Sequence, residues 1–135
     1  MAATPPLLAS VSVTLGGGVG ALLRYQLGRL TTAVLGPQAV STFPWATLFA
    51  NVLGSMAMGL LAGWLARHSE GGDQVRLLLG VGLLGGFTTF SSFSLEMMLL
   101  IERGQLALAL TYAGISLAAG LAALYVGLIM MRVSA

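Results

Sequence analysis

The sequence predicts an all-α integral membrane protein with four transmembrane helices. Six arginines and four acidic residues are the only charged side chains among its 135 residues. They leave uncharged runs at 30–66, 77–95 and 104–131. Each run approaches or exceeds the roughly 20 helical residues that cross a hydrocarbon core of about 30 Å. A soluble four-helix bundle is excluded, because it would need a charged face on every helix.

The first helix is expected at about residues 7–29, and the whole chain, 1–135, is expected to be a single four-span membrane domain. No Lys or Arg precedes Arg24 and no clear cleavage site follows the apolar run, so the segment is expected to be retained. Gly16 and Gly20 share a helix face with Arg24. The glycines predict close helix packing, whereas Arg24 either snorkels to the interface or lines an aqueous vestibule.

The second helix is expected at about 43–66, and Phe43–Trp45 opens it as an interfacial aromatic anchor. Polar residues then recur at every fourth position along one face, at Thr47, Asn51 and Ser55. A primary amide inside a membrane must find hydrogen-bond partners. The N–H donors of Asn51 suit either an anion or a carbonyl of another helix, and both alternatives are open.

The third helix is expected at about 75–101, and the segment Gly85–Ser94 predicts that it is broken near mid-membrane. This segment holds two glycines, five hydroxyls and three phenylalanines. Non-helical backbone at membrane depth is tolerated only inside protein or along a water-filled path. Phe90 and Phe93 lie on one face, where they either pack or turn positive ring edges toward an anion. Carbonyl oxygens freed by the break could bind an alkali cation.

The fourth helix is expected at about 105–131, after a tight turn at Glu102–Gly104. It repeats the spacing of four residues with Tyr112, Ser116 and Gly120. Four such helices are too few to enclose a pore alone, so oligomerisation is expected.

Arginines are balanced between the two ends of the predicted helices. Three fall on each side, Arg67, Arg76 and Arg132 against Arg24, Arg29 and Arg103. The positive-inside rule therefore gives no orientation. Either other cues set the topology, or copies insert both ways and form an antiparallel, dual-topology homodimer about a two-fold axis in the membrane plane.

Catalytic and nucleic-acid-binding functions are excluded by what the chain lacks. It has no cysteine, which removes disulfides and thiolate metal sites. Its one histidine, His68, is expected in a loop away from any serine nucleophile, and its acidic residues are too dispersed for paired-carboxylate catalysis. No concentrated basic patch suits nucleic acid. An enzyme is not expected.

Three blocks of the chain resemble the small bacterial fluoride channels of the Fluc type, also called CrcB or fluoride exporters. They are GGGVGALLRY at 16–25, FPWATLFANVLGS at 43–55 and GLLGGFTTFSSFSLE at 82–96. The resemblance implies a multi-pass protein of the bacterial cytoplasmic (inner) membrane that lets cytoplasmic fluoride leave passively. It also implies an antiparallel homodimer in the lipid bilayer, with two pores and a central structural sodium ion, Na+, that is not transported.

The resemblance further implies roles for individual residues. Phe90 and Phe93 are expected to contact fluoride by their ring edges, and Asn51 to be the pore asparagine. The other expected pore residues carry hydroxyls: Thr47, Tyr112, Ser116, Ser91 and Ser92. Gly85 and Thr88 would give backbone carbonyls to the sodium. Gly120 departs from the polar residue expected at its position, which predicts a shorter polar path.

The alternative function is a small dual-topology, proton-coupled cation or multidrug antiporter. Such a protein needs a carboxylate inside the membrane, and Glu96 is the only candidate. We expect Glu96 instead to hydrogen-bond locally or to face a vestibule. A scaffold without transport is a third hypothesis.

Overall fold

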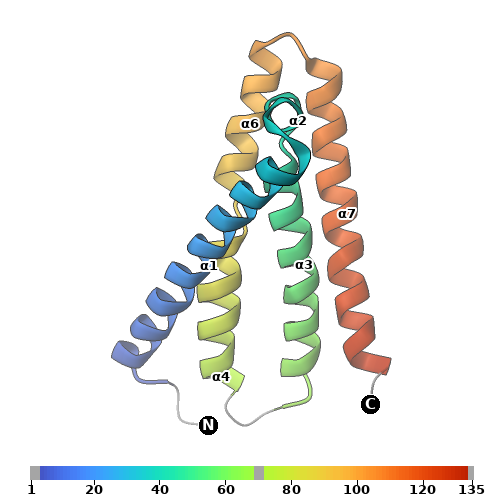
Figure 1. Cartoon of the computed structure of the whole chain (residues 1–135). Helices are drawn as coiled ribbons and strands as arrows, with labels where there is room; N and C mark the ends of the chain where they lie inside the picture. The colour runs from blue at the N-terminus through green and yellow to red at the C-terminus, as the bar shows by residue number, and fades with distance from the viewer. Residues whose placement is uncertain (1–3, 69–71, 134–135) are drawn as a thin grey trace.

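The computed structural model describes residues 4–68 and 72–133, and within those ranges every regular element is a helix. Four segments of this described chain are long and apolar enough to cross a membrane: Pro6–Leu35, Trp45–Leu65, Gly72–Glu102 and Leu106–Val133. The protein is therefore an all-helical, multi-pass membrane protein. Figure 1 shows α1 inclined across the other helices, which run more nearly parallel.

Helix α1 spans Pro6–Leu35 and is longer than the expected 7–29. No glycine or proline follows Arg29 until Gly36, where φ is 83° and the backbone N–H bonds the Thr32 carbonyl. Placing the helix end near Arg29 was wrong, because an arginine does not stop a helix, whereas glycine with a positive φ does. The short helix α2, Pro37–Thr42, follows and was not predicted.

Helices α3 (Trp45–Leu65) and α7 (Leu106–Val133) pack closely along their length. Glycines allow the approach: Gly59 lies against the backbone of Leu124, and Gly127 lies against the backbone of Met56. Small residues at helix interfaces are what close packing in lipid requires.

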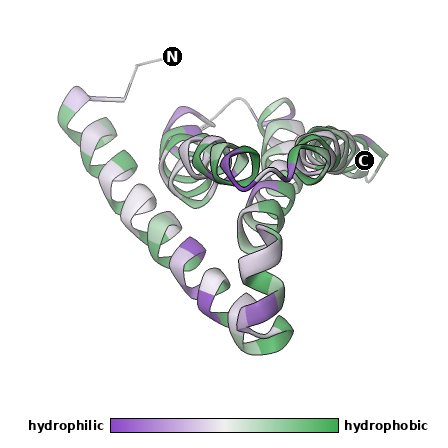
Figure 2. Cartoon of the chain, turned by 90° about the horizontal axis from the view of Figure 1, so that it is seen from above, coloured by the Kyte–Doolittle hydropathy of each residue, from purple (hydrophilic) through white to green (hydrophobic). Residues whose placement is uncertain are grey.

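The third candidate span begins with α4 (Gly72–Val75), the π-helix η1 (Arg76–Leu84) and the single turn α5 (Gly85–Phe87). Helix α1 packs on η1 and α5 through glycines of both segments, Gly16, Gly20, Gly82 and Gly86. The close packing expected of Gly16 and Gly20 is confirmed. Seen from above, the N-terminal end of α1 stands apart from the other helices (Figure 2).

Gly20→Ala is expected to destabilise the protein. A Cβ at Gly20 would collide with the backbone of Leu83 and lie 2.8 Å from the backbone nitrogen of Phe87. Overpacking of this kind costs about 1–3 kcal/mol, so the thermal unfolding midpoint in detergent should fall. Gly18→Ala is the matched control, because no other segment of the described chain comes within 4 Å of the Cβ position. Equal midpoints for the two variants would contradict this packing.

Between α5 and α6 (Phe90–Glu102) the backbone is extended. Thr88 has φ −82° and ψ 158°, and Thr89 has φ −152° and ψ 121°. Thr89 caps α6, because its hydroxyl accepts a hydrogen bond from the Ser92 N–H at 3.2 Å. Gly104, with φ 73°, then turns the chain into α7. Thr88 and Thr89, called the extended pair below, are thus flanked by helix on both sides within the third span.

Candidate functional site

Asn51 on α3 holds the extended pair in place. Its Nδ2 donates to the Thr89 carbonyl at 3.1 Å, and its Oδ1 accepts from the Thr89 N–H at 2.9 Å. The side chain therefore satisfies backbone groups that the missing helical turn leaves without partners. One N–H of the amide remains after these bonds. Asn51 thus bonds the carbonyl of another segment, that of Thr89, and its second N–H is still available to an anion.

Most hydroxyls near the extended pair bond within their own segment. Thr88 Oγ1 donates to the Leu84 carbonyl at 2.8 Å, and Ser94 Oγ donates to the Phe90 carbonyl at 2.9 Å. Thr89 Oγ1 lies 3.3 Å from Ser91 Oγ and donates to Ser92 Oγ at 3.2 Å. Hydroxyls satisfied in this way are compatible with a helix but add a polar face to it.

A cavity of about 360 Å³ lies beside the extended pair, between α3, α6 and α7. Its lining combines polar and aromatic side chains, among them Asn51, Ser55, Thr88, Thr89, Phe90, Phe93 and Ser116. Within the part of the chain that the structure describes, the Ser116 hydroxyl is buried and has no hydrogen-bond partner. A buried hydroxyl of this kind calls for a water or a ligand.

Aromatic rings form one wall of this site. The Phe90 and Phe93 centroids are 5.8 Å apart, and Phe93 lies 5.1 Å from Tyr112. Tyr112 is fully buried and meets Phe43 in an edge contact at 5.3 Å. Phe90 by contrast is 79% exposed. Phe93 is therefore half-buried and packs against the core, whereas the Phe90 ring is open.

Glu96 joins two of the expected pore residues. Thr47 Oγ1 donates to Glu96 Oε1 at 2.7 Å, and the Tyr112 hydroxyl donates to Oε2 at 2.8 Å. The carboxylate thus links α6 to α3 and α7, and it also lines a separate cavity of about 240 Å³ with Arg103. Our expected pore set omitted Glu96. The available signal was that it is the one acid inside the predicted helices.

Thr89 also lines a second cavity, of about 320 Å³, on the side of α1. Arg24, Thr47 and Ser92 line it too. The extended pair therefore has a cavity on each side, one with an arginine and one with the phenylalanines.

Three expected site residues are not in the lining of these cavities: Tyr112, which is buried, and Ser91 and Gly85. Ser91 and Gly85 are exposed on the single chain. Among the described residues, no hydrogen bond ends on the Thr88 carbonyl, and no three His, Asp or Glu side chains gather as metal ligands. An ion at this end of the break would have backbone oxygens available to it.

Comparison with known proteins places the whole chain among one group of relatives. The family profile described as "CrcB-like protein, Camphor Resistance (CrcB)" matches residues 11–128. The protein named "Fluoride-specific ion channel FluC" of Novosphingobium aromaticivorans is 57% identical over 126 residues, which cover 93% of this chain and 98% of that protein. The protein of the same name from Erythrobacter litoralis is 54% identical over 136 residues, covering 100% of both chains.

Proposed function

This chain belongs to the CrcB family, and from that premise we propose that it is a fluoride-selective channel of the bacterial inner membrane. It lets cytoplasmic fluoride leave down its gradient. The relatives' shared name supports fluoride as the ion, and their full-length similarity supports the same activity here. The proton-coupled antiporter has no support in these comparisons, and the Glu96 carboxylate that it would need already accepts two hydrogen bonds.

The observation that carries the proposal is the lining of the cavity beside Thr88 and Thr89. The unpartnered Ser116 hydroxyl, the remaining Asn51 N–H and the open Phe90 ring all border it. A hydroxyl and an amide donate to an anion directly, and a phenyl ring offers its positive edge. Several weak contacts in series let a strongly hydrated ion enter and still leave.

We further propose that two antiparallel copies form the channel, with one pore on each side of their axis. The exposed Phe90 and Gly85 of a single chain support a covering partner. Extended backbone at membrane depth also needs protein or water around it, because lipid offers no hydrogen bonds. The balanced arginines let the copies insert in opposite orientations.

A sodium ion is proposed at the glycine end of the break. Gly85 and Thr88 of each copy would hold it through carbonyl oxygens, and the unbonded Thr88 carbonyl fits this use. Oxygen ligands of this kind suit an alkali cation, whereas Zn²⁺ prefers nitrogen and sulfur ligands. When bound, the ion supplies a fixed positive charge that joins the two copies.

Reconstitution into liposomes tests the function. Vesicles loaded with potassium fluoride and given valinomycin should release fluoride to an external electrode, and the rate should not depend on a proton gradient. Vesicles loaded with chloride should release none. Cation uptake driven by protons, without fluoride release, would instead establish the antiporter. If neither fluoride release nor cation uptake occurred, the protein would be a scaffold without transport.

Dual topology predicts labelling from both sides of the membrane. His68→Cys lies after α3 and Gln105→Cys in the turn before α7, and both native residues are exposed in a chain without cysteines. Each single-cysteine variant should react with an impermeant maleimide to about half in intact cells and fully after permeabilisation. Complete labelling of one variant and none of the other in intact cells would establish one fixed orientation.

A further inference from the structure

A large groove runs beside the C-terminal half of α1. Its volume is about 630 Å³, and α2 and the start of α3 close its other side. Polar residues of α1 line one part, including Arg24, Tyr25, Arg29 and Thr32, and the apolar Val40 and Ala46 line another. The hydropathy colours show the hydrophilic positions of α1 in this half of the helix (Figure 2).

The two arginines of the groove have no protein counter-charge. Across residues 4–68 and 72–133, neither Arg24 nor Arg29 makes an ion pair or a side-chain hydrogen bond, whereas Arg76 bonds Asp73. No acidic side chain lines the groove. Both arginines lie within a candidate membrane span. An arginine inside a span is costly unless it pairs with an anion or reaches the interface.

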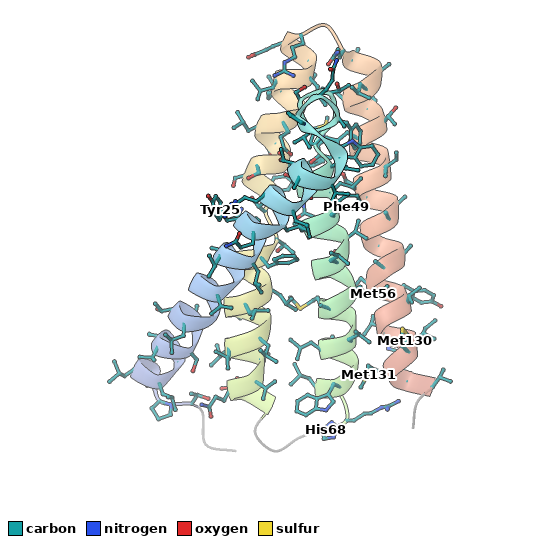
Figure 3. All side chains as sticks on the ribbon, in the orientation of Figure 1. Tyr25, Phe49, Met56, His68, Met130 and Met131 are labelled. Carbon is teal, nitrogen blue, oxygen red and sulfur yellow. The ribbon has the colours of Figure 1, made fainter. Side chains whose placement is uncertain are left out.

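Arg29 lies near the C-terminal end of α1, where a helix that spans a membrane is expected to approach the headgroups. It precedes the end of α1 at Leu35 by six residues, which is about 9 Å along a helix that rises 1.5 Å per residue. Tyr25 is 61% exposed and points away from α3 and α7 (Figure 3). Tyrosines are enriched at this interface.

We propose that the groove binds the phosphate of an anionic phospholipid headgroup, with Arg29 as its principal ligand. A guanidinium matches two phosphate oxygens at once, and Arg24 adds a second positive charge to the same groove. Val40 and Ala46 give the glycerol and acyl carbons an apolar surface. Arg24, Tyr25 and Ala46 also line the cavity beside Thr89, but Arg29 does not. Replacing Arg29 therefore tests the lipid site without changing that cavity, and the groove would hold this headgroup whatever ion crosses the protein.

Thermal unfolding in detergent tests the site. Adding phosphatidylglycerol should raise the unfolding midpoint of the wild-type protein by several degrees, because a ligand that binds only the folded state stabilises it. The shift should be lost in Arg29→Gln and kept in Arg132→Gln, which removes the same charge from the last turn of α7. Phosphatidylcholine and inorganic phosphate at equal concentration should give little or no shift.

Four results would overturn the proposal. The first is a phosphatidylglycerol-induced rise in the unfolding midpoint of Arg29→Gln that equals the rise in the wild type. The second and third are rises in the wild type with phosphatidylcholine or with inorganic phosphate that equal the rise with phosphatidylglycerol. The fourth is a lower dimer fraction of Arg29→Gln together with an unchanged rise in its midpoint on adding lipid. The last would assign the groove to a second copy of the chain. Should Arg29→Gln fail to fold, native mass spectrometry of the wild-type protein decides. Phosphatidylglycerol retained over phosphatidylcholine from an equal mixture supports the site, and equal retention rejects it.

Discussion

Phe90→Ile is expected to reduce fluoride efflux from liposomes to the background of protein-free vesicles, a fall of more than about tenfold. Isoleucine fills similar space but has no ring edge to face an anion. A tenfold fall corresponds to a barrier only about 1.4 kcal/mol higher. Because Phe90 is 79% exposed on the single chain, its replacement leaves no cavity in the core of that chain, and isoleucine keeps an apolar side chain of similar size where the proposed partner would cover it. The variant should therefore express and unfold thermally like the wild type, and a fluoride electrode measures the efflux.

Phe93→Ile should also stop fluoride flux, but with some loss of stability, because Phe93 packs 5.1 Å from Tyr112. Phe49→Ile is the matched control. Phe49 lies on α3 beside Trp45 and is not among the residues that line the cavity of Asn51 and Phe90, so the flux of this variant should match the wild type. Wild-type flux in both the Phe90 and Phe93 variants would refute the role of the ring edges.

The four membrane-spanning segments could be predicted because a charged side chain inside a membrane is costly, so long uncharged runs mark the spans. Most residues of the uncharged runs at 30–66, 77–95 and 104–131 are helical, and the interruptions include Gly36, the Phe43–Pro44 junction and the extended pair Thr88–Thr89. The same criterion gave the wrong end for α1, because an arginine near an interface is compatible with a continuing helix. The π-helix at Arg76–Leu84 has no signature in the hydropathy pattern, since its residues are as apolar as those of an α-helix.

The contacts of the site could be predicted only in part. Periodicity placed Asn51 on a polar face, but its partner Thr89 is 38 positions away, and no spacing rule shows which helix a face will meet. Thr47 and Tyr112 were expected along one path, yet the residue that connects them is Glu96, which lies 49 and 16 positions from them. The dimer, its two pores and the sodium ion involve a second copy, and they stay predictions.

Asn51→Leu is expected to abolish fluoride flux and also to destabilise the protein. Leucine removes both hydrogen bonds to Thr89. The N–H and the carbonyl of Thr89 would then be left without partners in an apolar setting, at a cost of about 1–3 kcal/mol each. Thermal unfolding in detergent should show a clear fall in the midpoint, and the liposome assay should show background flux.

Asn51→Asp separates the amide's structural role from its role toward the anion. A carboxylate can still accept from the Thr89 N–H, so the fall in unfolding midpoint should be smaller than for leucine. It offers no N–H to fluoride and adds a like charge to the cavity, so flux should still be lost. Thr111→Ala is a control, because Thr111 bonds only its own helix at Ala107 and is exposed. If the aspartate variant kept wild-type flux, Asn51 would serve only to hold the Thr88–Thr89 backbone, and the Ser116 hydroxyl and the ring edges would have to bind the ion without it.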